Sequence, residues 1–110
     1  MTPALRAMRA SPQVGHPFVG VLDAPAGTAY AVFSALQSDY VPVTGLGLWH
    51  LGSPDTLLAS GLIGTAQIAA FSLTVPSQSA LTGAGLFFQA ITNGHSTSLQ
   101  LTDLLHGRVR

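Results

Sequence analysis

The chain has 110 residues, of which 47% are hydrophobic and only 7% are charged, and its formal net charge is zero. This length suits one domain with one hydrophobic core, so we predict a single domain over residues 1–110, with 1–10 as an N-terminal arm or first strand. Four arginines split between the two chain ends do not form the cationic stripe that nucleic-acid binding requires. The high hydrophobicity and zero net charge exclude intrinsic disorder.

Cysteine is absent, which excludes disulfides and thiolate metal sites. Breakers interrupt every apolar run, so no transmembrane helix is predicted, and residues 1–10 lack the apolar stretch of a signal peptide. If the domain is exported, we expect its export signal to lie outside this sequence. Soluble domains average about 25% charged residues, so we expect a partner, a second copy or a parent protein to cover part of this surface.

Helix patterns are nearly missing, because seven prolines and twelve glycines interrupt most windows. Short β-type runs remain, and they predict strands over 18–22, 28–36, 45–51, 56–62, 65–75, 85–92, 97–102 and 104–109. Short strands at such spacing predict an all-β, antiparallel β-sandwich of about seven to nine strands with little or no helix. Circular dichroism should therefore be dominated by β-structure.

Alternation along three of these runs predicts which side chains face the core. In 65–75, Phe71 and its alternate neighbours are expected inward and Gln67 on the more polar face. In 97–102, Leu99 and Leu101 are expected inward and Thr102 outward. The run 104–109 alternates in the same way, and we expect three side chains to point outward: His106, Arg108 and Arg110.

Asn93-Gly94 is a strong signal for a two-residue hairpin turn, because both residues tolerate positive φ. On this interpretation Gly94→Val should cost roughly 1 kcal/mol or more.

No motif for catalysis or metal binding is evident, and we predict neither a cofactor nor a metal site. The four histidines, His16, His50, His95 and His106, show no ligand spacing. The sequence lacks a GxSxG nucleophile elbow, a phosphate loop and any Glu. Convergence of loop aspartates, or of Asp with His, would be needed for a small hydrolase or lyase.

The aromatic residues Tyr40 and Trp49 are the candidate ligand-binding residues, since exposed rings in sandwich loops stack on sugars or peptides. The alternative is that Trp49 fills the core between the sheets. Gln89 lies inside an apolar run. If it is buried, its amide must form hydrogen bonds with backbone groups or water.

Phe87 and Phe88 are adjacent in a predicted strand, so they should point to opposite faces of one sheet. One core covers only one of those faces. With few charges and no net charge to keep copies apart, we expect a homo-oligomer or filament that buries a sheet face or pairs an edge strand.

Several short stretches together resemble the small β modules near the C-termini of large secreted proteins from planctomycete- and myxobacterium-like bacteria. They are Gly15-His16-Pro17-Phe18, Ala24-Pro25-Ala26-Gly27, Val75-Pro76, Ala80-Leu81-Thr82-Gly83, Leu86-Phe87-Phe88-Gln89-Ala90 and Leu99-Gln100-Leu101-Thr102-Asp103-Leu104-Leu105. The resemblance covers almost the whole chain, with departures at Thr102-Asp103 and Ile63-Gly64-Thr65. It implies a β-sandwich in an extracellular setting and carries no catalytic residues.

Composition, apolar strands and this resemblance lead to one expectation: a non-enzymatic structural or interaction module of a secreted or cell-surface bacterial protein that associates with itself. The alternative is a carbohydrate- or peptide-binding module that uses Tyr40 and Trp49. A flat exposed pair of rings would favour binding, whereas buried rings would favour the structural role.

Overall fold

The computed structural model describes residues 3–7, 12, 15–43, 47–52, 55–75, 82–94 and 99–110. Within these residues the chain forms strands and no helix. The strands are β1 (Ala4–Ala7), β2 (Pro17–Asp23), β3 (Ala29–Ala35), β4 (Ser38–Val43), β5 (Gly47–Leu51), β6 (Thr56–Leu62), β7 (Ile68–Thr74), β8 (Gly85–Asn93), β9 (Leu99–Leu101) and β10 (Leu105–Arg108).

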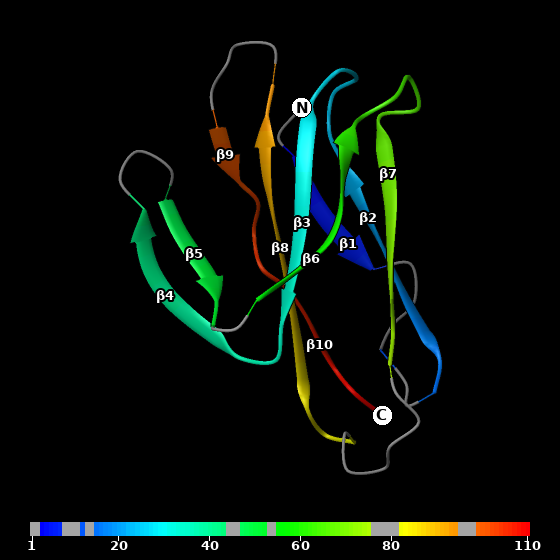
Figure 1. The fold of residues 1–110 in the computed structure, drawn as a ribbon, viewed down its shortest axis with the longest axis vertical. Coiled ribbons are helices and arrows are strands. Elements are labelled where there is room, and N and C mark those ends of the chain that lie inside the picture. Colours follow the sequence, from blue (N-terminus) through cyan, green and yellow to red (C-terminus); the bar gives the residue numbers. More distant parts are fainter. Residues whose placement is uncertain are drawn as a thin grey trace.

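The strands form three antiparallel sheets (Figure 1). One has the order β1-β2-β7, and the second has the order β10-β8-β3-β6 with β9 also paired to β8. Strands β4 and β5 form a separate hairpin. The predicted all-β antiparallel sandwich is confirmed, and the described residues form ten strands where about seven to nine were predicted.

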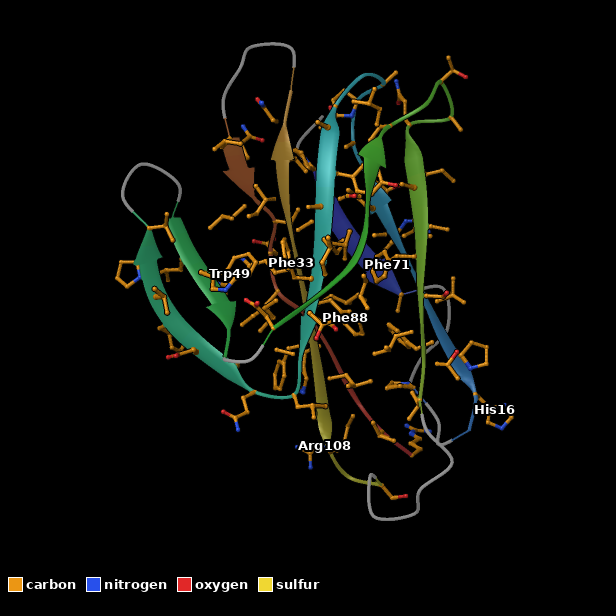
Figure 2. All side chains as sticks on the ribbon, in the orientation of Figure 1. His16, Phe33, Trp49, Phe71, Phe88 and Arg108 are labelled. Atoms are coloured by element: carbon orange, nitrogen blue, oxygen red, sulfur yellow. The ribbon has the colours of Figure 1, made fainter. Side chains whose placement is uncertain are left out.

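The core lies between the first two sheets. Its centre is Phe88 of β8, which is completely buried and stacks on Phe18 of β2 at 5.0 Å between ring centroids. Phe71 of β7 lies 5.7 Å from the Phe88 ring (Figure 2). Three rings from three strands and both sheets therefore join the two layers.

The expected alternation holds along β8. Leu86, Phe88 and Ala90 are buried in the core, whereas Phe87 is half-buried and stacks on His106 of β10 at 4.6 Å with nearly parallel rings. In β10, His106 and Arg108 are exposed as predicted. Phe87 and Phe88 thus occupy opposite faces of the same sheet.

Strand β7 is shorter than the predicted run. It starts at Ile68, because residues 65–67 form a turn in which Gln67 has a φ of 61°. Gln67 is therefore not a strand residue, and its carbonyl accepts a hydrogen bond from the Ala24 N–H at 3.1 Å. From Ile68 onward the predicted faces are correct, since Phe71 is buried and Ser72 is exposed.

The prediction of a two-residue turn at Asn93-Gly94 is wrong, although β8 and β9 are antiparallel neighbours. Asn93 pairs with Leu99 and Thr92 with Gln100, so Asn93 and Gly94 are not the two central residues of a tight turn. Residues 95–98, including His95, lie outside the described residues. Gly94 has no positive φ, and the effect expected from Gly94→Val loses its basis.

The predicted faces of β9 are also wrong. Leu99 is half exposed, whereas Thr102 is 5% exposed. The strand ends at Leu101, and beyond it the Thr102 hydroxyl accepts a hydrogen bond from the Ala90 N–H at 2.9 Å. Thr102 is buried because its polar atoms satisfy the edge of β8.

Gly20 of β2 lies directly opposite Phe71 of β7, and the Phe71 ring covers it. A Cβ built on Gly20 would lie 2.3 Å from Phe71 Cζ. We expect Gly20→Ala to lower the free energy of unfolding by about 1–3 kcal/mol, because the ring must leave its place in the core. Urea denaturation measures this, with Gly94→Ala as the control, since a Cβ there meets nothing within 4 Å. Equal stability of the two variants would contradict this packing.

Candidate functional site

The β4–β5 hairpin forms an additional layer on the outer face of the larger sheet, and Gln89 of β8 holds it there. The Gln89 side chain is completely buried. Its Oε1 accepts a hydrogen bond from the His50 N–H at 2.7 Å, and its Nε2 donates to the carbonyl oxygens of Leu48 at 3.0 Å and Thr102 at 2.9 Å. Gln89 is buried and its amide binds backbone groups, as the sequence predicted for that case, and it provides β5 with a donor and an acceptor.

Strand β4 was not predicted, because Asp39 and Pro42 are unfavourable in strands. It is nevertheless tolerated, since β4 pairs only with β5 among the described strands, and proline is accepted in an edge strand.

The two predicted ligand-binding residues both lie in this hairpin, but they do not form one platform. Trp49 of β5 packs edge-on against Phe33 of β3, with ring centroids 5.5 Å apart (Figure 2). Tyr40 of β4 packs edge-on against His50 at 5.4 Å. Because Trp49 and His50 are neighbours in one strand, their side chains point to opposite faces of the hairpin.

The exposure of the two rings differs accordingly. Tyr40 is 73% exposed, whereas Trp49 is half-buried between the hairpin and the sheet. Trp49 therefore does not fill the core between the two sheets of the sandwich either. A binding site built on a flat pair of rings is not what this arrangement offers, because a ligand on Tyr40 would not reach Trp49.

The titratable residues do not assemble into a metal site within the described ranges, where no group of three or more His, Cys, Asp or Glu side chains is present. Asp23 of β2 instead accepts hydrogen bonds from Arg6 of β1, with the shortest distance 2.7 Å from Arg6 Nε. This carboxylate raises the pKa of the Arg6 guanidinium, first through the hydrogen bond and second through its charge. The pair lies across the β1–β2 ladder, whose register joins Ala4–Ala7 to residues 20–23.

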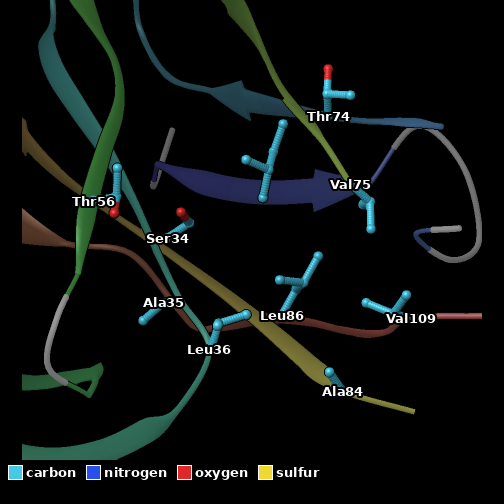
Figure 3. Close-up of a pocket in the computed structure, with 10 residues that line it drawn as sticks. Ser34, Ala35, Leu36, Thr56, Thr74, Val75, Ala84, Leu86 and Val109 are labelled. Atoms are coloured by element: carbon cyan, nitrogen blue, oxygen red, sulfur yellow. The ribbon is translucent and has the colours of Figure 1, made fainter. Parts of the chain in front are cut away.

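An apolar cleft of about 310 Å³ lies between the two sheets of the sandwich. Its walls are the end of β3, the end of β7 and the start of β8 (Figure 3). The lining residues are Ser34, Ala35, Leu36, Thr56, Leu73, Thr74, Val75, Ala84, Leu86 and Val109. None of these described lining residues is charged, and Leu36 among them is 61% exposed.

The cleft lies at the end of the larger sheet where β6 no longer pairs with β3. β6 begins at Thr56 opposite Ser34, so the following residue of β3, Ala35, has no partner in β6. Sheet β1-β2-β7 continues past this point, since Leu73 and Thr74 of β7 form the opposite wall. The two sheets are therefore unevenly matched at this end, and an apolar opening results.

Strands β6 and β7, which end the two sheets, lie next to each other on this side of the sandwich. We call the apolar cleft together with β6 and β7 the open side. Three large apolar side chains of these strands are well exposed: Leu57 at 54%, Leu62 at 73% and Ile68 at 45%. Leu57 and Leu62 lie on the outer face of the larger sheet, opposite Phe33 and Ala29, and Ile68 lies on the outer face of the smaller sheet. Neither strand contains a charged residue.

Sequence reasoning did not find the open side, although a signal for it exists. Residues 56–102 contain no Asp, Glu, Lys or Arg. This stretch includes both strands of the open side together with β8 and β9, so β6 and β7 are free of charge.

Comparisons with known proteins give one distant structural likeness. No family model matches the sequence, and no curated protein matches it. The crystal structure of Spo0M, a sporulation control protein from Bacillus subtilis, is similar to this chain with a TM-score of 0.49 and 9% identity. The match covers 99% of this chain and 49% of that protein, so the chain spans about half the length of Spo0M. In the described residues no helix is long and apolar enough to cross a membrane.

Proposed function

We propose that this domain is a non-enzymatic structural or interaction module that associates with copies of itself through the open side. The observation that carries the proposal is the juxtaposition of two uncharged edge strands, β6 and β7, with an apolar cleft between the sheets. The secreted or cell-surface setting that we propose for its parent protein rests on the sequence resemblance.

Exposed apolar area is the physical reason for association. Burying apolar surface is worth about 25 cal/mol per Å², so covering side chains such as Leu36, Leu62 and Ile68 gives a favourable term to any interface that includes them. An apolar cleft bordered by an exposed apolar side chain such as Leu36 is typical of an interaction site.

Electrostatics does not oppose contact between copies. The formal net charge is zero, and no charged residue lies between Asp55 and Asp103. Strands β6 and β7 of two copies therefore bring no like charges together when they meet, and they contain no ion whose desolvation would cost free energy.

Sedimentation equilibrium over about 1–100 µM protein tests the proposal. We expect the weight-average mass to rise with concentration above the 11.3 kDa of one chain. Because the open side is uncharged, association should persist at about 1 M NaCl, where contacts between exposed charges are screened. A mass of one chain at every concentration would contradict self-association, and loss of association at high salt would contradict the open side as its site.

A further inference from the structure

The free edge of β7 is the most regular part of the open side. We propose that β7 pairs antiparallel with β7 of a second copy about a two-fold axis, which joins the two β1-β2-β7 sheets into one. This inference rests on the proposed self-association and names the strand that mediates it. Among the described residues β7 has one neighbour in its sheet, β2, so its other edge is unpaired.

The distribution of protective residues distinguishes β7 from the edges on the other side of the sandwich. Proteins protect edge strands with charges, prolines, bulges or short length, because unpaired backbone groups recruit other strands. Edge strand β1 carries Arg6, and β10 carries Arg108. Strand β4 contains Asp39 and Pro42.

The remaining edges are protected in other ways. Strand β9 is three residues long. Strand β6 is uncharged, but its pairing with β3 shifts between Val32 and Phe33, so Leu58 forms a bulge that interrupts its edge. The free edge of β5 is satisfied in part by the amide of Gln89.

Strand β7 has none of these protections. Its seven residues are Ile68–Thr74, without charge or proline, and they pair with β2 in an unbroken register from Asp23 to Pro17. A long, regular, uncharged edge of this kind is what β-augmentation uses, since main-chain hydrogen bonds provide the affinity.

A second copy fits this edge because β7 is compatible with itself. In a fully overlapping antiparallel register centred on Phe71, Ala70 lies opposite the partner's Ser72, and Ile68 lies opposite the partner's Thr74. These residues are all exposed on the outer face of the sheet, and none is charged or bulky enough to prevent close approach. The added strand also lies along the cleft, because Leu73 and Thr74 form one of its walls.

Charge substitutions on β7 test the pairing by sedimentation equilibrium of the intact chain. In Ala70→Lys/Ser72→Lys, cations face each other twice across the two-fold axis, and we expect the dissociation constant to rise about tenfold or more. In Ala70→Lys/Ser72→Asp, opposite charges face each other in this register, and we expect a dissociation constant within about threefold of the wild type. The matched control is Ala4→Lys, an exposed alanine on the far edge of the same sheet, which should leave the dissociation constant unchanged.

We expect circular dichroism of each variant to match that of the wild type, because the substituted positions are exposed. If the double-lysine variant has the dissociation constant of the wild type, the β7 pairing is overturned while self-association stands. The same conclusion follows if Ala4→Lys raises the dissociation constant as much as the double-lysine variant does. Failure of Ala70→Lys/Ser72→Asp to recover association would overturn the proposed register. A wild-type chain that stays monomeric would overturn the proposed function, and the pairing with it.

Discussion

Phe88→Ala is expected to lower the free energy of unfolding by about 3–5 kcal/mol, the usual cost of removing a fully buried phenylalanine. Phe88 is completely buried and contacts the rings of Phe18 and Phe71, so alanine leaves a cavity that both sheets border. Neither sheet can fill that cavity without losing its partner contacts. Chemical denaturation followed by circular dichroism measures the loss.

The neighbouring residue provides the matched control. Phe87 is half-buried on the opposite face of the same strand, where its ring stacks on His106. We expect Phe87→Ala to cost about 1 kcal/mol, because only part of its apolar area leaves water on folding. If the two alanine variants were equally stable, β8 would not have the alternation that the sandwich requires.

Gln89→Met is expected to cost about 2–4 kcal/mol, with the largest effect on the β4–β5 hairpin. Methionine has a similar length but no amide, so the His50 N–H and the carbonyls of Leu48 and Thr102 lose their partner. Buried polar groups left unpaired cost about 1–3 kcal/mol each, and water can satisfy some of these at the hairpin. A thermal melt measures the overall loss.

Tryptophan fluorescence reports the hairpin separately, because the chain has one tryptophan. Trp49 packs on Phe33, so release of the hairpin in Gln89→Met should shift its emission to the red below the melting transition. The control is Gln100→Met in β9, an exposed glutamine whose replacement should change stability by no more than about 0.5 kcal/mol. Wild-type emission and melting in Gln89→Met would mean that the amide does not hold the hairpin.

The strands of the core could be predicted from the sequence because their signals are local. Strand β6 was predicted with its observed bounds, and β3 and β8 to within one residue at each end. In β8 a run of apolar residues and the alternation of Phe87 with Phe88 reflect a strand whose one face is fully buried.

Features that depend on distant contacts could not be predicted. The sequence does not distinguish a core position of Trp49 from a ligand site, because that position depends on Gln89. The Gln89 contacts of β5 span 39 and 41 residues. Thr102 was assigned to the wrong face because alternation holds only while the strand continues, and β9 ends at Leu101. The turn preference of Asn93-Gly94 gives a wrong prediction, because Asn93 pairs with Leu99 and this register overrides the preference of the dipeptide.

The location of the open side also depends on contacts between distant residues. Sequence composition indicated an uncovered apolar surface, but not where it lies. The cleft requires that β6 begin opposite Ser34, which leaves the end of β3 without a partner, and pairing between strands over 20 residues apart is not encoded in either segment alone. Exposure of Leu62 at 73% likewise follows only once β6 is known to end its sheet.

Amide hydrogen exchange of the wild-type chain, compared at dilute and concentrated protein, tests association through the open side most directly. Exchange of an edge amide is fast when it faces water and slows when a strand pairs with it. We predict that concentration slows exchange in peptides that cover β7, Ile68–Thr74, while peptides that cover β1, Ala4–Ala7, exchange at the same rate. Slowing at β1 or β10 without any at β7, or no dependence on concentration anywhere, would contradict the account.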